Sequence, residues 1–179
     1  MGDSGGTVGI DDGGRVSLRA CFDRYNCDKG WRHGYERFYE PLLAPLRDRP
    51  LTLLEIGIWR GASIAAWLDY LPNAEILAVD TFQRVAPEGV PILRHPRVRW
   101  WKLDSTRKAP SGIAADLVID DGSHLPAAQR ATLRRFWPLL REGGRYVIED
   151  APNLRLPEAR AHDLRVGGNS DSFIVELVR

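Results

Sequence analysis

Short apolar runs recur along most of this chain, and they are separated by helix-length or loop-like segments. Segments 61–71 and 126–140 have the length and apolar content of helices. Strands that alternate with helices form parallel βαβ units. The pattern therefore predicts an α/β fold with a doubly wound, Rossmann-like sheet, mostly parallel, with a C-terminal antiparallel strand. The expected strands are residues 51–56, 75–79, 98–103, 115–119, 145–148 and 172–178.

The helix expected at 126–140 carries start and stop signals. Pro126 suits a first helical turn, because the amide hydrogen that proline lacks has no partner there. Gly143 and Gly144 predict the end of the helix. Pro138 should bend or shorten it, because a proline ring clashes with the preceding turn.

The N-terminal part divides into two stretches. Residues 1–14 contain six glycines and few apolar side chains. Such a stretch cannot bury enough surface to offset its ordering entropy, so we expect a disordered tail there. Residues 16–46 have helical spacing. A length of 179 residues suits one domain, which we expect to span residues 15–179.

Composition restricts the partners and the compartment. The net charge is +1 and charged residues make up 27% of the chain, so no nucleic-acid partner is expected. No apolar run approaches the ~20 residues of a membrane span. Cys21 and Cys27 have no further zinc-type ligands at suitable spacing, and we expect reduced thiols in a cytoplasmic protein.

Acidic residues end two of the expected strands. Asp120 and Asp121 follow one apolar run, and Glu149 and Asp150 follow the next. Neighbouring parallel strands bring their carboxyl ends to one edge, where ligands bind. Carboxylates gathered there repel one another unless a cation or proton intervenes, and their oxygens suit Mg²⁺. The sequence therefore predicts a metal-assisted reaction with His124 nearby as a base.

A glycine-containing loop leaves the first strand. Gly57 and Gly61 allow close backbone approach to a ligand, and Asp80 ends the second strand, where a carboxylate can receive ribose hydroxyls. Trp59 occupies the position of the middle glycine of a dinucleotide loop, and Glu55 would repel a phosphate. A cofactor without phosphate, such as S-adenosylmethionine, fits better. The alternative is a ligand-free turn that Asp80 caps.

These residues resemble the cofactor motifs of class I S-adenosylmethionine-dependent methyltransferases. More narrowly, the chain is similar to the metal-dependent macrolide and deoxysugar O-methyltransferases of the mycinamicin and tylosin type, over about residues 21–179. The matching segments are Leu53-Leu54-Glu55-Ile56-Gly57 with Gly61, Ala78-Val79-Asp80, Leu103-Asp104-Ser105, Asp28-Lys29-Gly30 with Tyr35 and Tyr39, Val118-Ile119-Asp120-Asp121-Gly122-Ser123-His124, and Tyr146-Val147-Ile148-Glu149-Asp150.

The resemblance implies roles for particular residues. Asp121, Glu149 and Asp150 would bind Mg²⁺, and His124 would be the general base. The implied cofactor-binding residues are Glu55, Gly57 and Gly61 near the amino acid end, Asp80 near the ribose, and Asp104 and Ser105 near the adenine. Asp120 is interpreted as structural. His33, His95 and His162 are interpreted as surface or core residues, while Trp31 and Tyr35 are candidates for an acceptor pocket.

The expected function is Mg²⁺-assisted O-methylation of a hydroxyl on a sugar or glycosylated natural product in antibiotic biosynthesis. Three alternatives stay open: a catechol-type O-methyltransferase, a non-catalytic S-adenosylmethionine-binding accessory protein, and a nicotinamide-dependent oxidoreductase. Residues 151–179 leave room for two strands and a short connection. One wall of the substrate pocket could then come from another subunit, which makes a homodimer possible.

Overall fold

The protein is built on one seven-stranded sheet, seen in a computed structural model that describes residues 9–10, 14–166 and 170–179. Most of the tail expected at residues 1–14 lies outside the described residues. The strand order is β3-β2-β1-β4-β5-β7-β6. The strands are β1 (Leu51–Ile56), β2 (Ala74–Asp80), β3 (Val98–Lys102), β4 (Ala115–Asp120), β5 (Leu140–Ile148), β6 (Arg160–Asp163) and β7 (Phe173–Val178).

Strands β1 to β5 pair in parallel, whereas β7 is antiparallel to both β5 and β6. The expected doubly wound, mostly parallel sheet with an antiparallel C-terminal strand is confirmed. Residues that face each other at the carboxyl ends include Ile56 with Asp120, and Asp120 with Ile148. This register places the acidic residues that follow β4 and β5 on the same edge as the turn that follows β1.

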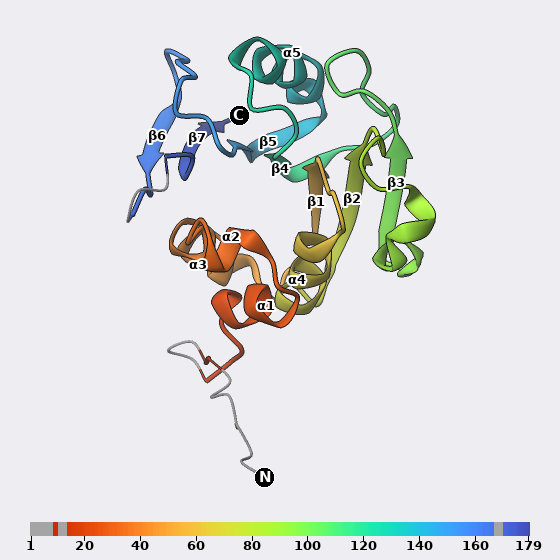
Figure 1. The fold of residues 1–179 in the computed structure, drawn as a ribbon, viewed down its shortest axis with the longest axis vertical. Coiled ribbons are helices and arrows are strands. Elements are labelled where there is room, and N and C mark those ends of the chain that lie inside the picture. Colours follow the sequence, from red (N-terminus) through yellow and green to blue (C-terminus); the bar gives the residue numbers. More distant parts are fainter. Residues whose placement is uncertain (1–8, 11–13, 167–169) are drawn as a thin grey trace.

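Helices cover both faces of the sheet (Figure 1). The helices are α1 (Leu18–Arg24), α2 (Asp28–Trp31), α3 (Glu36–Leu43), α4 (Ala62–Tyr70) and α5 (Pro126–Phe136). Helices α1 to α4 lie on one side and α5 on the other. Successive strand residues point to opposite faces, so Leu53 joins the core under α1, α3 and α4, while Leu54 joins the core that includes Phe136.

Three boundaries differ from those expected. Helix α5 ends at Phe136, and the 3₁₀ turn Trp137–Leu139 contains Pro138, in line with the expected shortening. Gly143 and Gly144 do not end the helix: they lie within β5, which begins at Leu140, and Gly143 has a φ of 74°. The expected loop between β2 and β3 contains two 3₁₀ turns, Pro87–Gly89 and Pro91–Arg94.

In the part of the chain that the structure describes, no helix has both the length and the apolar character needed to cross a bilayer. The two cysteines, Cys21 and Cys27, are buried and not joined to each other, as expected for reduced thiols.

Candidate active site

The candidate site lies where β1, β4 and β5 end. Asp121 follows β4, and its amide donates to the carbonyl of Ile56 at the end of β1 (2.9 Å). Glu149 follows β5, and its amide donates to the carbonyl of Asp120 (3.0 Å). The sheet hydrogen bonding therefore continues into the acidic residues and fixes their backbone next to the turn after β1.

Gly57 makes this close arrangement possible. It has a φ of 83°, and a Cβ atom built on it would lie 2.2 Å from the carbonyl oxygen of Asp121. No side chain can occupy that space, and the backbone conformation itself disfavours residues with a Cβ. Glycine is therefore required so that the turn after β1 can pack against the backbone of Asp121.

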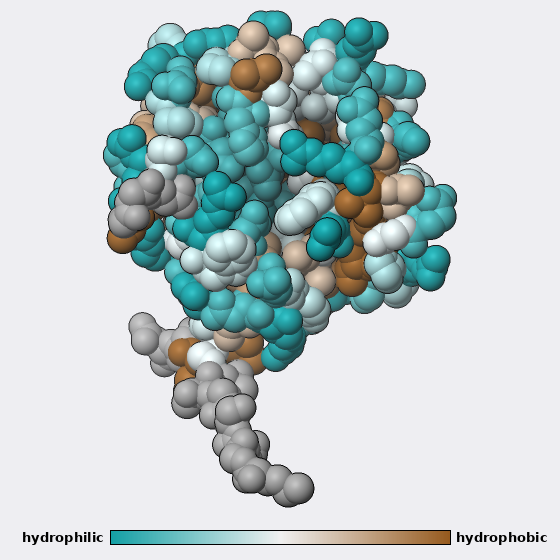
Figure 2. Space-filling view, in the orientation of Figure 1, coloured by the Kyte–Doolittle hydropathy of each residue, from teal (hydrophilic) through white to brown (hydrophobic). Residues whose placement is uncertain are grey.

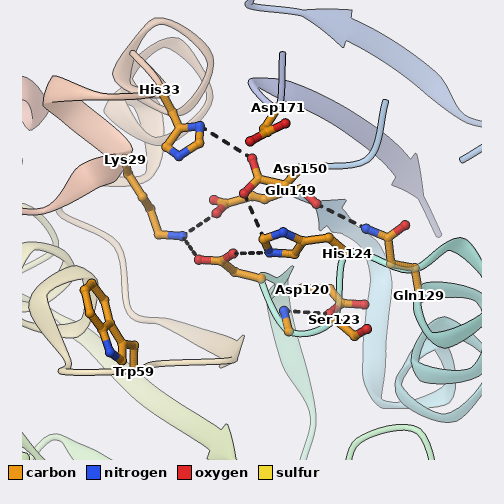
Figure 3. Close-up of polar contacts among 12 residues, drawn as sticks. Lys29, His33, Trp59, Asp120, Ser123, His124, Gln129, Glu149, Asp150 and Asp171 are labelled. Atoms are coloured by element: carbon orange, nitrogen blue, oxygen red, sulfur yellow. Dashed lines mark hydrogen bonds and ion pairs between the residues drawn. The ribbon is translucent and has the colours of Figure 1, made fainter. Parts of the chain in front are cut away.

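Asp121, His124 and Asp150 converge in the structure, and Figure 3 shows His124 beside Asp150. Each offers one ligand atom, and these atoms all lie within 4.8 Å of one another. His124 Nε2 is 3.6 Å from Asp121 Oδ1 and 3.6 Å from Asp150 Oδ2. The His124 side chain is 54% exposed, so a solvent-borne molecule can reach it. Two carboxylates and an accessible imidazole thus share one small volume, as the sequence predicted.

Glu149 lies beside this group but is not one of its members. Its side chain is buried, with Oε2 against the ammonium of Lys29 and Oε1 accepting a hydrogen bond from the Tyr39 hydroxyl (2.5 Å). A carboxylate oxygen has two acceptor sites, so these contacts leave capacity for a further partner. The structure brings two of the three predicted metal ligands, Asp121 and Asp150, together with His124, whereas the Glu149 carboxylate faces Lys29 and Tyr39.

Asp150 is held by two side chains from the N-terminal segment. The Tyr35 hydroxyl donates to Asp150 Oδ1 (2.5 Å), and His33 Nδ1 lies 3.5 Å from the same oxygen. His33 also contacts the Ser172 hydroxyl (3.1 Å) and stacks on Tyr35. Asp150 has a φ of 50°, which is uncommon for a residue with a side chain. Its tyrosine and histidine contacts oppose relaxation of that backbone.

The charged groups of the site shift one another's pKa values. Burial alone would raise the pKa of Asp121, but Lys29 and His124 outweigh it and lower that pKa to about 2. The hydrogen bond with Asp121 raises the pKa of His124 above its usual range. Burial raises the pKa of both Glu149 and Asp150. Asp121 is therefore the carboxylate most firmly held in its charged form.

Asp120 differs from its neighbour. It is buried, and it accepts weak hydrogen bonds from the Gly122 amide (3.3 Å) and the Tyr146 hydroxyl (3.4 Å). Burial raises its pKa to about 7. Its place beneath the turn after β4 agrees with the structural role expected from the sequence.

Glu55 lies below the site and not at its surface. It has no exposed area, and its Oε2 accepts hydrogen bonds from the Ser63 hydroxyl (3.1 Å) and the Trp67 indole (3.0 Å). Its Oε1 lies 3.4 Å from the Lys29 ammonium. Glu55 was expected near the amino acid end of a cofactor. Its side chain is instead fully buried, so it is not accessible to a ligand. Any effect of Glu55 on a ligand would pass through these partners.

Asp80 organises the loop after β1. Its Oδ2 accepts from the amides of Ile58 (2.9 Å) and Trp59 (3.3 Å), and its Oδ1 accepts from the amide of Phe82 (2.6 Å). The capping role that was the alternative expectation is thus present. Because Asp80 occupies two loop amides, they are not free to cradle a phosphate as in a dinucleotide site. This favours a cofactor without phosphate at that loop.

The remaining predicted cofactor residues follow β3. Asp104 Oδ1 accepts from both the amide (2.9 Å) and the hydroxyl (2.6 Å) of Thr106, and Ser105 contacts the hydroxyl of Thr132 on α5 (3.1 Å). Both residues stay partly exposed. Trp59 is 52% exposed with a φ of 45°, and Trp31 is 58% exposed, whereas Tyr35 is buried. The face drawn in Figure 2 is mainly hydrophilic, with a hydrophobic band on its right side.

Sequence reasoning missed the residues that hold the acidic groups in place. Lys29 and Tyr39 contact Glu149, and His33 contacts Asp150. His33 was interpreted as a surface or core residue; it is buried, but it lies next to the site. The segment with Lys29, Tyr35 and Tyr39 was part of the family resemblance, which was the one available signal, but Lys29 and Tyr39 had no assigned role and Tyr35 was expected only as a candidate for the acceptor pocket.

The donor set fits a hard divalent cation. Asp121 and Asp150 supply carboxylate oxygens, Glu149 lies alongside, and His124 adds an imidazole nitrogen. Carboxylate oxygens are the preferred ligands of Mg²⁺, and a histidine is a general base or a ligand in such surroundings. Lys29 is a competing cation at the same carboxylates, since its Nζ lies 2.7 Å from Asp121 Oδ2.

Comparison with known proteins gives consistent results. A methyltransferase-domain family model matches residues 54–151. The chain is 34% identical over 149 residues to the 8-demethyl-8-(2-methoxy-alpha-L-rhamnosyl)-tetracenomycin-C 3'-O-methyltransferase of Streptomyces olivaceus, covering 78% of this chain and 36% of that one. It is 36% identical over 137 residues to the L-olivosyl-oleandolide 3-O-methyltransferase of Streptomyces antibioticus, covering 71% and 35% respectively.

A solved structure is also similar. The MycE methyltransferase from the mycinamycin biosynthetic pathway, in complex with Mg, SAH and mycinamycin VI, superposes with a TM-score of 0.65 at 29% identity. The match covers 75% of this chain and 39% of that one. The chain thus spans little more than a third of the length of these relatives. The family model covers more than half of the chain, from the second half of β1 through β5 to the acidic edge, and this protein belongs to the methyltransferase-domain family.

Proposed function

We propose that this chain, as a single domain over residues 15–179, is an S-adenosylmethionine-dependent, Mg²⁺-assisted O-methyltransferase. The acceptor we propose is a sugar hydroxyl of a glycosylated natural product in antibiotic biosynthesis. The observation that carries the proposal is the convergence of Asp121, His124 and Asp150 at the carboxyl edge of the sheet. The names of the relatives, which methylate rhamnosyl and olivosyl compounds, support the acceptor class.

In this proposal Asp121, Glu149 and Asp150 hold the divalent cation. Asp121 Oδ1 and Asp150 Oδ2 each lie 3.6 Å from His124 Nε2, and Glu149 keeps unused acceptor capacity. When bound, Mg²⁺ would polarise the acceptor hydroxyl and S-adenosylmethionine would supply the methyl group. The chain's own residues then need to orient the acceptor and to take up its proton.

His124 is the proposed proton acceptor, through the ring nitrogen that does not face the two carboxylates. Its Nε2 lies 3.6 Å from both Asp121 and Asp150, and these carboxylates stabilise the imidazolium that forms when the hydroxyl loses its proton. The pKa of His124 is raised for this reason, by the Asp121 hydrogen bond first. A positioned base of this kind contributes typically ~10²–10⁴-fold to a rate. The exposure of His124 leaves room for the acceptor on its open side.

The proposed cofactor side is the edge formed by the turns after β1, β2 and β3. Gly57 and Gly61 allow the loop after β1 to pack closely against its neighbours. Asp80 accepts hydrogen bonds from that loop and retains acceptor capacity for ribose hydroxyls. Asp104 and Ser105 are the proposed neighbours of the adenine, and Glu55 would support the site from beneath. Asp80 occupies the amides of Ile58 and Trp59, which are then not available to a phosphate, and this supports S-adenosylmethionine over a nicotinamide dinucleotide.

A cytoplasmic location and a homodimer belong to the same proposal. Buried, unbridged Cys21 and Cys27 suit a reducing compartment. The side chains of Trp31 and His124 are exposed, and in a dimer a second copy would cover them and complete the acceptor pocket. Light scattering of the purified chain tests the assembly.

The function is tested by binding and by turnover. Calorimetry should show S-adenosylmethionine binding and no NAD binding. A methylation assay with rhamnosyl and olivosyl glycosides and with catechols should show transfer to the glycosides that EDTA abolishes and Mg²⁺ restores. Transfer to catechols alone would identify the catechol-type enzyme instead. Binding of S-adenosylmethionine without transfer to either class would indicate an accessory protein, and NAD binding alone would exclude the methyltransferase.

A further inference from the structure

Lys29 is an unusual lysine for its position. The chain has three lysines, and Lys102 and Lys108 are exposed, whereas Lys29 on α2 is 2% exposed. A lysine is almost never fully buried unless it is paired. Neither the metal-binding nor the proton-transfer roles proposed above require this residue, so its burial needs a separate explanation.

The ammonium of Lys29 contacts three carboxylates from three strand ends. Its Nζ lies against Glu149 Oε2, 2.7 Å from Asp121 Oδ2 and 3.4 Å from Glu55 Oε1 (Figure 3 shows the first two contacts). Glu55 belongs to β1, while Asp121 and Glu149 directly follow β4 and β5. Helix α2 thus places the positive charge of Lys29 between carboxylates from three strand ends.

The two carboxylate oxygens of Asp121 have different partners. Oδ2 faces Lys29, and Oδ1 faces His124, on the side where Asp150 Oδ2 lies. Like charges this close are unfavourable without a cation between them. Lys29 supplies a cation on the buried side, and it leaves Asp121 Oδ1 and Asp150 Oδ2 facing the accessible histidine.

We propose that Lys29 is a built-in counter-cation and positioning residue, which holds Asp121 and Glu149 in place and allows the acidic site to fold before any divalent ion binds. The part of this inference that concerns the divalent ion rests on the function proposed above. The ammonium and a dication on Asp121 would act on the same carboxylate. They therefore compensate for each other in part: when one is removed, the other contributes more to stability.

The test compares two substitutions of Lys29 in the full chain. Lys29→Met keeps the length of the side chain and removes its charge, whereas Lys29→Arg keeps the charge. Lys102→Met is the matched control, because it removes a lysine charge from the exposed surface. The melting temperature of each protein is measured in EDTA and in saturating MgCl₂, and Mg²⁺ affinity is measured by calorimetry.

In EDTA, Lys29→Met should melt roughly 10 °C below the wild type, because a broken buried ion pair leaves carboxylates uncompensated. Lys29→Arg should lose less, and Lys102→Met should match the wild type. Mg²⁺ should raise the melting temperature of Lys29→Met more than that of the wild type and bind it about tenfold more tightly, because a competing charge is gone. A loss of equal size in EDTA and in MgCl₂ would mean that Lys29 only fills space, and would overturn the inference.

A double variant keeps the test decisive if Lys29→Met does not fold in EDTA. Lys29→Met with Glu149→Gln removes one negative charge together with the positive one, and it should recover part of the lost stability. Failure of both Mg²⁺ and Glu149→Gln to recover it would overturn the counter-cation role. If the wild type binds no Mg²⁺, the metal site proposed above fails, and the EDTA measurements with the double variant still decide the role of Lys29.

Discussion

Asp121 is the residue on which the candidate site is centred. Its side chain contacts Lys29 on one side and His124 on the other, and its carbonyl oxygen packs against the Gly57 turn. The low pKa of its carboxyl keeps it charged throughout the physiological range. A fixed negative charge between an ammonium and an imidazole accounts for the orientation of both, because each is drawn to the nearer oxygen.

Replacing His124 should separate proton transfer from cofactor binding. His124→Gln keeps a polar side chain of similar reach but has no lone pair basic enough to accept a proton. We expect turnover to fall ~10²–10⁴-fold, and the S-adenosylmethionine dissociation constant to change less than about threefold. Steady-state kinetics with a glycoside acceptor and calorimetry measure the two effects. If the affinity for S-adenosylmethionine fell by as large a factor as turnover, the result would count against a role of His124 as a base.

Asp120 should make stability depend on pH in the opposite direction to a salt-bridged acid. Its folded-state pKa is about 7, above the usual 3.8, so the folded protein holds a proton that the unfolded chain releases between pH 4 and 7. Over that window its contribution to the free energy of unfolding declines, by up to about 1.4 kcal/mol per pH unit, and levels off above pH 7.

Asp120→Asn removes this titration. The variant should match the wild type or be slightly less stable at pH 4, gain on it steadily as the pH rises to 7, and keep a constant advantage above that. Urea unfolding at several pH values measures the difference. A difference that does not change with pH would show that Asp120 titrates normally in the folded state.

At the scale of elements, the turn from β1 to α4 and the end of β4 are packed backbone to backbone. Gly57 and Gly112 provide a matched pair of glycines with positive φ, 83° and 71°. Only at Gly57 does a Cβ atom collide with protein, 2.2 Å from the Asp121 carbonyl oxygen, whereas nothing lies within 4 Å of the Gly112 position. Comparing alanine substitutions at the two positions therefore separates the free-energy cost of the backbone conformation from the cost of the steric collision.

Gly57→Ala should therefore destabilise the fold far more than Gly112→Ala. Backbone strain at a positive φ costs about 1–2 kcal/mol per residue, and this cost is common to both. The collision at Gly57 adds to it, and we expect a loss above about 3 kcal/mol there with reduced Mg²⁺ affinity, because Asp121 must move. Chemical denaturation and calorimetry measure both. Similar losses for the two variants would contradict the close packing described here.

At the scale of the whole molecule, we expect the fold of the wild type to form without bound metal. The sheet carries two apolar cores, one under α1, α3 and α4 and one under α5, and neither includes the acidic residues. Tyr35, Tyr39 and Lys29 already provide hydrogen bonds and positive charge to the carboxylates. The fold should consequently persist when metal is removed, although the reaction should stop.

Chelation provides the corresponding measurement. EDTA should abolish methyl transfer by the wild type, while its melting temperature changes by less than about 5 °C and its far-ultraviolet circular dichroism stays the same. Adding MgCl₂ should restore transfer. Loss of the fold in EDTA would mean that the metal is structural, and transfer at full rate in EDTA would remove the proposed metal roles of Asp121, Glu149 and Asp150.

The sequence by itself determined most of the sheet and its acidic edge, but not that Gly143 and Gly144 lie within β5. The expected strand at residues 51–56 coincides with β1, and the other expected strands overlap β2 to β5 and β7, because buried parallel strands are continuous apolar runs between turn residues. The convergence of Asp121, His124 and Asp150 was predictable for the same reason: neighbouring parallel strands end at one edge.

Only the tertiary structure decided what surrounds those carboxylates. Lys29 contacts Asp121 and Glu149 across 92 and 120 residues of sequence, and His33 contacts Asp150 from a similar distance along the chain. The periodicity of apolar residues predicts which face of a helix or strand is buried. It does not predict which side chain of a distant helix contacts that face. The burial of Glu55 and the orientation of Glu149 toward Lys29 follow from how α2 and α3 pack on the sheet, and that packing is set by contacts between distant segments of the chain.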